Sequence, residues 1–456
     1  MSNIKKAAWL LAAIPFAFVI AVPSKAPAIP YFARKYKTTC SRCHMAVPKL
    51  NTFGKNFQLH GYQQPGDKDL NKITFPEDPN LTVIDQPPVA FLMENQVQAD
   101  KSNGNRTAVN LSSPYVFHIF ASDTFAPDLG FFGELADQGG VTDIGKVSLI
   151  ASHLGNQNIF LNVGNLDVTE HGVTEHDLYG RSGYGVQDIG LASAGVGQGF
   201  ILSSQHMGAR VYGLIGASVT PDLIHGKQST GEEDQAKKAD NSSVRPLKMQ
   251  KSKKEDDDMK EEADPMDQLK GFLWEVGMYN STNLSPTADN PNPNDYSARL
   301  NAYFSGDSFV GVQAYSGLMN VGTGVANRFR FAGPDFSYYF GKPIEKSKGM
   351  MVKPFNLLGG YMTGQADNPN DDGNRVSWNG YYLELNYAVS PRSMCFLRYD
   401  KVNSNNLGAL QTTVTDAVTA NYTYYLRTNF WLGLEYTQDL TSAKQNMLGF
   451  LFNFAF

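Results

Sequence analysis

The chain has 456 residues and a net charge of −5, with 42 Gly, 22 Tyr and 28 Phe but only three Cys. This charge provides no basic excess for a nucleic-acid partner. Beyond the first residues no stretch is long and apolar enough for a membrane helix, which argues against a helical membrane protein. A closed β-barrel stays possible, because it also satisfies every backbone group inside lipid.

The first 28 residues predict a signal peptide. Lys5 and Lys6 precede an uncharged apolar run from Ala7 to Val22, and Ala26-Pro27-Ala28 gives an A-x-A cleavage pattern. A transmembrane anchor is the alternative, since the run approaches the length that spans a bilayer. The cleavage pattern and the absence of a basic stop-transfer cluster favour cleavage after Ala28, and therefore export.

Residues 29–87 form the predicted haem segment, which contains Cys40-Ser41-Arg42-Cys43-His44. C-x-x-C-H is the signal for covalent attachment of a c-type haem. Residues three and four apart on a helical turn share one face, so both thiols can join the haem vinyl groups while His44 reaches the iron. Thr38 or Thr39 is a suitable N-cap for this turn.

Two other interpretations of the cysteine pair stay open at this point. A zinc half-site would need a second pair of ligands, and the remaining cysteine, Cys395, lies far away in a strand-like run. A disulfide between Cys40 and Cys43 suits an oxidising compartment but leaves His44 unexplained. One covalent haem c is therefore the cofactor that we predict.

A second short helix is predicted from Lys49 to His60, after Pro48 ends the first turn and with Gly61 as its C-cap. Four of its residues share one stripe: Leu50, Phe53, Phe57 and His60. We predict that the first three pack against the haem. The alternative is that the stripe packs against the barrel wall.

The sixth iron ligand has three candidates. His60 is the first choice, because it shares the aromatic stripe and could fold over the haem. Met93, in or near the first strand, is the second, and an unligated or water-bound iron is the third. Met45 is adjacent to His44 and cannot reach the opposite face of the haem.

Residues 88–456 predict an outer-membrane barrel, because short alternating runs are separated by turn residues. The clearest runs are 272–279, 299–304, 381–387 and 430–436. Their polar residues tend to one face, as expected for lipid outside and water inside: Glu275, Asn301, Glu384, Asn386 and Glu435. Sixteen or seventeen strands can be counted, and an even number favours about sixteen antiparallel strands.

The last residues strengthen this fold class. Aromatic residues stand at Phe450, Phe452, Phe454 and Phe456, a strict period of two that places all four rings on one face of a strand. The pattern resembles the closing strand of bacterial outer-membrane barrels. A soluble β-sandwich, or an exported soluble cytochrome with a β-domain, would not explain it. The predicted fold is an all-β transmembrane barrel with a small α-helical haem segment.

One segment, Gly226 to Asp267, has almost no aromatic or β-branched residues and includes the charged run from Lys251 to Asp258. Such a segment predicts a disordered loop. It follows the seventh expected strand, which would place it outside the cell. Its acidic run could gather Fe²⁺, but a solvated loop is the simpler interpretation.

The stretches Thr39 to His44, Pro48 to Phe57 and Gly61-Tyr62 resemble the fused monohaem cytochrome–porin family of iron-oxidising bacteria. The resemblance is confined to this short region. It implies an outer-membrane iron oxidase in which Cys40, Cys43 and His44 hold the haem. Electrons would pass from extracellular Fe(II) to a periplasmic cytochrome or other carrier, within a barrel embedded in outer-membrane lipid.

Two other functions stay open. The chain could be an electron conduit whose donor or acceptor is not iron, since the sequence sets neither the direction nor the donor. It could also be a diffusion porin whose haem segment is a structural plug.

Overall fold

The computed structural model describes residues 31–64, 72–75, 77–84, 86–101, 108–126, 128–138, 140–174, 183–191, 200–217, 219–224, 265–280, 295–305, 308–321, 325–347, 350–367, 374–406, 410–411, 416–427, 429–441 and 446–456. The predicted signal peptide, residues 1–28, lies outside these ranges. Among the described residues, no helix is both long and apolar enough to cross a bilayer.

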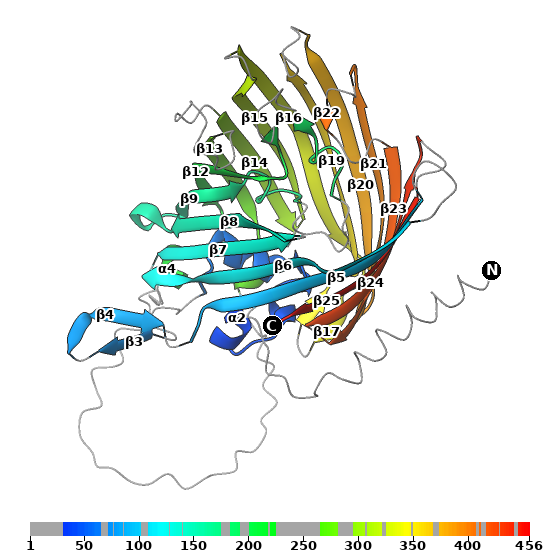
Figure 1. The fold of residues 1–456 in the computed structure, drawn as a ribbon. Coiled ribbons are helices and arrows are strands. Elements are labelled where there is room, and N and C mark those ends of the chain that lie inside the picture. Colours follow the sequence, from blue (N-terminus) through cyan, green and yellow to red (C-terminus); the bar gives the residue numbers. More distant parts are fainter. Residues whose placement is uncertain are drawn as a thin grey trace, which may run out of the picture.

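Sixteen antiparallel strands form a closed barrel (Figure 1). In chain order they are β5 (Val89–Lys101), β6 (Ala108–Ala126), β7 (Leu129–Gln138), β8 (Val141–Ala151), β9 (Ile159–Asp167), β12 (Gln205–Ile215), β13 (Gly271–Tyr279), β14 (Asp295–Ser305), β15 (Ser308–Val321), β16 (Val325–Phe340), β19 (Phe355–Ala366), β20 (Val376–Ser390), β21 (Ser393–Ser404), β23 (Asp416–Arg427), β24 (Phe430–Asp439) and β25 (Asn446–Ala455). Each strand pairs with the next, and β25 pairs with β5 to close the ring. The predicted number of strands is confirmed.

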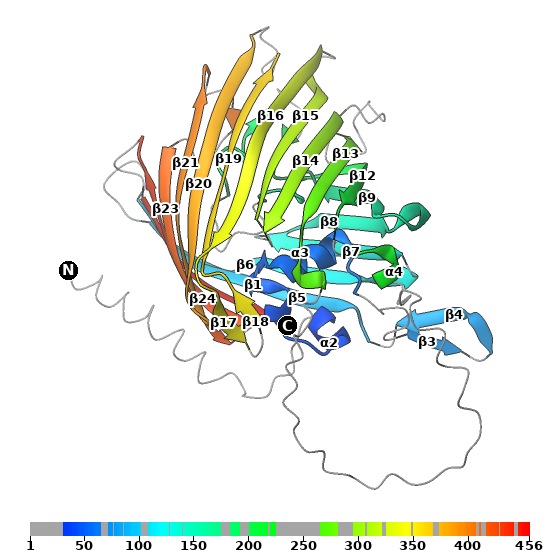
Figure 2. The ribbon, with the colours of Figure 1, turned by 180° about the vertical axis from the view of Figure 1, so that it is seen from behind.

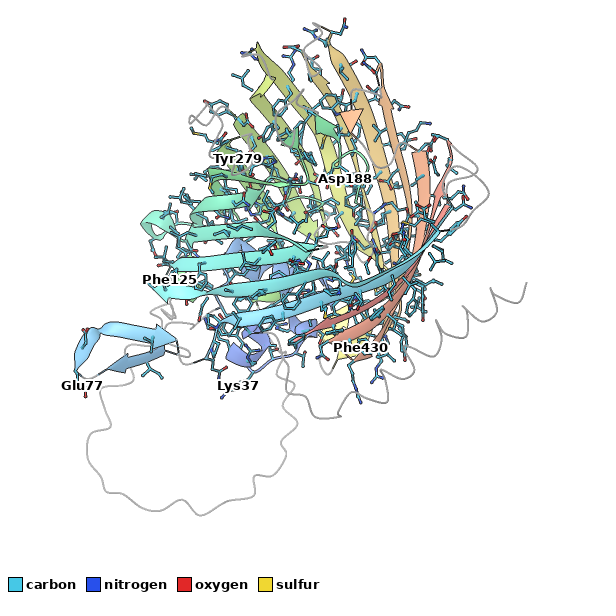
Figure 3. The ribbon with its side chains drawn as sticks, in the orientation of Figure 1. Lys37, Glu77, Phe125, Asp188, Tyr279 and Phe430 are labelled. Carbon is cyan, nitrogen blue, oxygen red and sulfur yellow. The ribbon has the colours of Figure 1, made fainter. Side chains whose placement is uncertain are left out.

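The two faces of the wall differ as the alternation predicts. On β13, Phe272 and Val276 are 61% and 53% exposed on the outer face, whereas Glu275 between them is 2% exposed in the lumen. Likewise Phe125 on β6 is exposed and Tyr279 on β13 is buried (Figure 3). An apolar outer face is the property that a wall in lipid requires.

The lumen is filled where its predicted polar residues lie. All of them face inward and are buried: Glu275, Asn301, Glu384, Asn386 and Glu435. Two other parts of the chain enter the lumen, and His171 contacts both Glu275 and Asn301. One is the N-terminal segment, residues 31–64, and the other is the connection between β9 and β12.

The closing strand is confirmed. Asn446 to Ala455 pair in register with Lys101 to Leu92. The Phe456 ring stacks on Phe91 with 5.3 Å between centroids, and the two backbones exchange hydrogen bonds. The terminal aromatic row therefore seals the last strand against the first on the outer face of the barrel.

The N-terminal segment lies at one end of the barrel, against the wall from within (Figure 2). Its elements are α2 (Tyr31–Lys35), the 3₁₀ turn η1 (Cys40–Arg42), β1 (His44–Ala46), β2 (Lys49–Leu50) and α3 (Thr52–Leu59). It bonds to strands all around the ring: Lys35 to Asp123 on β6, Tyr212 on β12 to the Leu59 carbonyl, Lys49 to Asn356 on β19, and Tyr425 on β23 to the Val47 carbonyl. The segment therefore spans the lumen.

The second helix is shorter than predicted. It begins at Thr52 instead of Lys49, because the side chain of Asn51 caps it by accepting a hydrogen bond from the Gly54 N–H at 2.9 Å. Lys49 and Leu50 instead form β2, which pairs with β1. At the other end His60 is the C-cap and Gly61 follows with φ +68°, a left-handed conformation that suits glycine.

The remaining elements lie between the wall strands or before them. They are the hairpins β3 (Lys72–Phe75) with β4 (Asp78–Ile84) and β17 (Ile344–Ser347) with β18 (Met350–Val352), the small sheet of β10 (Gly190–Leu191), β11 (Phe200–Ile201) and β22 (Leu410–Gln411), and the short helices η2 (Leu154–Asn156), α4 (Pro221–Ile224) and η4 (Pro265–Asp267).

The strand count before the Gly226–Asp267 loop needs correction. Residues 225–264 lie outside the described ranges, but η4 at their end is ordered, with Met266 fully buried. The loop follows β12, which is the sixth wall strand and not the seventh, because β10 and β11 belong to a separate sheet. β12 therefore ends, and β13 begins, at the N-terminal rim, where β5 begins and β25 ends.

Candidate haem site in the barrel lumen

The two cysteines of the C-x-x-C-H sequence lie on a short helical turn. Cys40 to Arg42 form η1, and the Cys43 N–H donates to the Cys40 carbonyl at 3.2 Å. Thr39 is the N-cap by position, but its hydroxyl contacts the Ser41 hydroxyl instead of capping the turn. The predicted turn is confirmed, except that His44 already begins β1.

Cys40, Cys43 and His44 line one cavity of about 390 Å³. Apolar and aromatic residues of the N-terminal segment and of strands β5 to β7 line much of this cavity: Tyr31, Phe32, Tyr36, Leu50, Phe57, Tyr62, Leu92, Phe120 and Phe132. Its size and lining are those of a small-molecule pocket. The three residues of the motif therefore share one space.

His44 is held in an orientation that suits a metal ligand. Its Nδ1 lies 2.8 Å from the Pro48 carbonyl oxygen. A carbonyl oxygen only accepts, so Nδ1 carries the proton and the ligating lone pair of a neutral imidazole is on Nε2. Metal-binding histidines commonly donate their other N–H in this way.

The thiols are poor candidates for a zinc half-site or a reactive pair. Burial raises the pKa of Cys40, and it raises the pKa of Cys43 to about 12, whereas thiolate chemistry needs a lowered pKa. Both are free thiols. Within the described ranges, no three His, Cys, Asp or Glu side chains gather closely enough to hold a metal ion. Cys395 sits on β21 opposite Tyr387 and Tyr422, in the outward row.

Helix α3 braces the cysteine turn. The Asn51 side chain donates to the Ser41 and Arg42 carbonyls, and its N–H donates to the Cys43 carbonyl. Gly54 lies so close that a Cβ there would overlap the Cys43 carbonyl oxygen. Two thiols on a braced turn, an oriented imidazole and an adjoining apolar cavity together fit a covalently attached haem.

The predicted packing residues divide into two groups. Leu50 and Phe57 line the cavity, Leu50 from β2 and Phe57 from α3. Phe53 does not: the Arg42 guanidinium covers its ring at 3.8 Å, and it joins a buried cluster with Met266. The expectation that Phe53 packs against the haem is therefore wrong, because its ring is covered by Arg42 and packs in the cluster with Met266 instead.

His60, the first choice for the sixth ligand, is turned away from the cavity. It is fully buried, its Nδ1 contacts the Asn56 carbonyl at 2.8 Å, and its ring packs beside His153 and Phe160. Burial lowers its pKa to about 4, so it is a neutral core residue. The prediction that His60 binds the iron is corrected: it packs against the wall.

Met93, the second choice, is also misplaced for ligation. It pairs directly with Phe454 on β25, and directly opposed residues share a face of the sheet. Phe454 belongs to the outward aromatic row that ends at Phe456, onto which it stacks. Met93 therefore points to the outside of the barrel and does not line the cavity.

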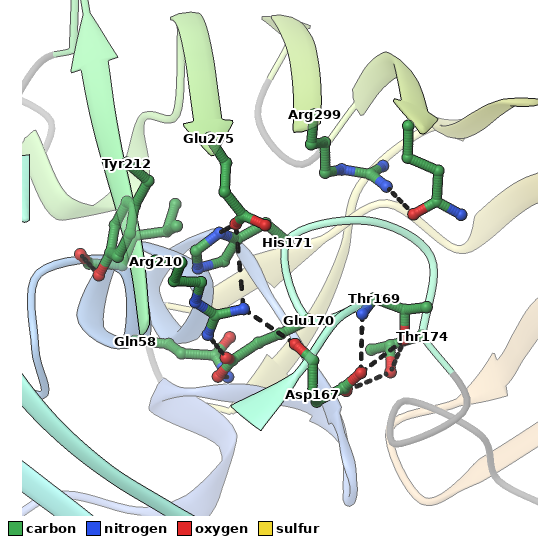
Figure 4. Close-up of polar contacts among 12 residues, drawn as sticks. Gln58, Asp167, Thr169, Glu170, His171, Thr174, Arg210, Tyr212, Glu275 and Arg299 are labelled. Atoms are coloured by element: carbon green, nitrogen blue, oxygen red, sulfur yellow. Dashed lines mark hydrogen bonds and ion pairs between the residues drawn. The ribbon is translucent and has the colours of Figure 1, made fainter. Parts of the chain in front are cut away.

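Sequence reasoning missed a cluster of polar contacts in the barrel lumen (Figure 4). The connection after β9 brings Glu170 and His171 into the lumen, where both line the cavity. Glu170 bonds to Lys146 and Arg210, and His171 contacts Glu275 at 2.5 Å. The one available signal is that strict alternation stops after β9, at a run of polar residues from Thr169 to His171.

Comparison with known proteins finds no matching family model and no curated relative. Solved structures of similar fold include the loop L8 deletion mutant of OmpT from Vibrio cholerae (13% identity, 81% of this chain and 99% of that chain, TM-score 0.46). OmpF from Salmonella typhi in complex with daunomycin (10%, 81% and 97%, 0.47) and the channel DcaP from Acinetobacter baumannii (10%, 81% and 96%, 0.43) are further examples. These values carry no inference about haem or transport.

The closed ring of strands and its apolar outer face decide the class on their own. The chain is an outer-membrane β-barrel of sixteen antiparallel strands.

Proposed function

We propose that this barrel holds one covalent haem c in its lumen and passes electrons from extracellular Fe(II) to a periplasmic carrier. The observation that carries the proposal is the cavity shared by Cys40, Cys43 and His44, inside a closed barrel. A bound haem would supply one-electron redox chemistry there. The iron specificity rests on the sequence resemblance alone.

The chain's own residues would hold, orient and shield the group. Cys40 and Cys43 would form the thioether bonds, and His44 would present Nε2 to the iron while Pro48 fixes its ring. The aromatic lining from Phe32, Phe57 and the wall would shield the group from water, which favours electron transfer over side reactions.

A route toward a carrier would lie beside the same turn. A second cavity, of about 310 Å³, is lined by Cys40, His44 and the rim residues Arg392 and Arg427. Arg392 and Arg427 stand at the N-terminal rim, where several connections between wall strands are only two residues long. Short connections are typical of the periplasmic side of bacterial barrels, so a periplasmic carrier could approach the site from this rim.

The filled lumen favours this function over solute diffusion. The N-terminal segment bonds to strands β6, β12, β19 and β23 and so crosses the opening. An open porin would instead present its inward polar residues to water, whereas Glu384 and Asn386 are buried. A channel closed in this way should conduct ions poorly in planar bilayers.

The test is the visible spectrum of the purified full-length protein on addition of Fe²⁺. The haem bands should change from the oxidised to the reduced form in the wild type. His44→Ala should keep its covalent haem but lose the low-spin spectrum and the response to Fe²⁺, because the axial imidazole is gone. His153→Ala, a buried histidine outside the cavity, is the matched control.

Wild-type protein that carries haem yet stays oxidised in excess Fe²⁺ would reject iron as the donor. Wild-type protein that carries no covalent haem would reject the proposal as a whole. Ion conductance typical of an open porin would favour the diffusion function.

A further inference from the structure

The haem cavity contains a second histidine. Among the described residues, two histidines and no methionine line it, namely His44 and His171. His and Met are the common axial ligands of haem iron. His44 comes from the N-terminal segment, and His171 comes from the connection that follows β9, so the two imidazoles enter the cavity from independent parts of the chain.

His171 is oriented by a buried carboxylate. Its Nδ1 lies 2.5 Å from the Glu275 carboxylate on β13, and both side chains are at most 3% exposed (Figure 4). A carboxylate only accepts, so Nδ1 carries the proton and, in the neutral ring, Nε2 carries the lone pair. This matches the support that the Pro48 carbonyl gives to His44, and a carboxylate on the far nitrogen is typical of metal-binding histidines.

The backbone around His171 is fixed as well. The Asn301 side chain donates to the His171 carbonyl at 2.6 Å, and the Val173 N–H donates to Asp335 at 3.0 Å. The His171 ring also packs on Tyr212, with 4.5 Å between centroids. A ligand must be held in place by its surroundings before the metal arrives, and these contacts do so for His171.

Charged groups close to the pair have partners of their own. Arg210 lies 3.9 Å from Glu275, but it also donates to the Asp167 carbonyl and pairs with Glu170. Arg299 pairs with Asp335. Arg210 and Arg299 are therefore each paired with a carboxylate other than Glu275, and the Glu275 carboxylate contacts His171.

We propose that His171 is the second axial ligand of the haem and that Glu275 is the residue that positions it. This inference rests on the proposed haem site and deepens it. It replaces His60 and Met93, which the fold directs away from the cavity.

The test is the spin state of the oxidised full-length protein, read by visible and electron paramagnetic resonance spectra. The wild type should be low-spin. His171→Ala should become high-spin while keeping its covalent haem, and added imidazole should restore the low-spin signal by filling the vacated position. His60→Asn and His153→Ala should stay low-spin, because neither residue lines the cavity.

Glu275 is tested by a pair of variants. Glu275→Leu removes the acceptor for Nδ1 and should produce a high-spin fraction. Glu275→Gln also loses the charge but retains an oxygen that can accept from Nδ1, so it should recover the low-spin state. If the charge of Glu275 mattered only for the stability of the barrel, the two variants would behave alike. Heat-dependent gel mobility shows whether each barrel has assembled.

The outcomes separate the two proposals. An assembled His171→Ala protein with haem and an unchanged low-spin spectrum overturns the role of His171, as does a wild type that is already high-spin. A wild type without covalent haem overturns the proposed function itself.

Discussion

The barrel wall and the N-terminal segment reach their structures by different means. In the wall each residue is placed by a local rule, because alternate side chains face lipid or lumen and each strand pairs with its neighbour. In the N-terminal segment the decisive contacts are long-range: Lys35 meets Asp123, Lys49 meets Asn356, and Arg42 meets Asp267. The wall can therefore be derived from periodicity, and the segment cannot.

This difference explains how the predictions fared. The strand number, the inward polar residues and the closing strand follow from a period of two, and all are confirmed. The C-x-x-C-H turn is equally local, and its three residues do line one cavity. The strand count before the Gly226–Asp267 loop is wrong by one, because β10 and β11 belong to a separate sheet.

The orientation of His60 failed for a different reason. Helical spacing places it on one stripe with Phe57, but it is the C-cap residue, and its Nδ1 turns to the Asn56 carbonyl. Which stripe meets the wall and which meets the cavity depends on strands far away in sequence. For the same reason the sequence could not indicate His171, because its partner Glu275 lies on β13, more than a hundred residues away.

The largest effect should follow from removing both thiols. Cys40→Ser with Cys43→Ser should abolish haem staining on a denaturing gel, since nothing else can attach the group covalently. The barrel should still show heat-dependent mobility, because the wall closes through its own strand pairs. Cys395→Ser, on the outer face, is the control and should stain like the wild type. If the variant without the two thiols fails to form the barrel, the wall does not fold independently of the N-terminal segment, and this prediction is wrong.

A smaller effect should follow from breaking the buried ion pair that docks the segment. Lys35 and Asp123 lie 2.8 Å apart with side chains at most 2% exposed. Lys35→Met leaves a buried carboxylate without its cation and should cost about 3–5 kcal/mol. Proteolysis of residues 31–64 should accelerate by about two orders of magnitude or more, since about 1.4 kcal/mol is tenfold. The exposed Lys37→Met is the control, and equal cleavage of both variants would contradict the docking role.

The pH dependence of the segment should be weaker but distinctive. Burial lowers the pKa of His60 from 6.5 to about 4, so the unfolded form binds the proton more readily. The free energy of unfolding therefore has its full contribution from neutral His60 above about pH 6.5. It declines by up to about 3 kcal/mol as the pH falls to 4, because the unfolded form takes up a proton that the folded form does not. Near-ultraviolet circular dichroism during heating should show this loss in the wild type. His60→Asn should have a flatter profile between these pH values; an identical profile would rule out the titration of His60 as the cause.

The most direct test of the central claim is electron transfer across the assembled barrel. The full-length protein is inserted into vesicles that enclose an oxidised, soluble c-type cytochrome, with the N-terminal rim facing inward as checked by protease access. We predict that Fe²⁺ added outside reduces the enclosed cytochrome, and that vesicles with the His44→Ala protein do so no faster than empty ones. An enclosed cytochrome that stays oxidised in wild-type vesicles, although the protein carries its haem, would contradict the account.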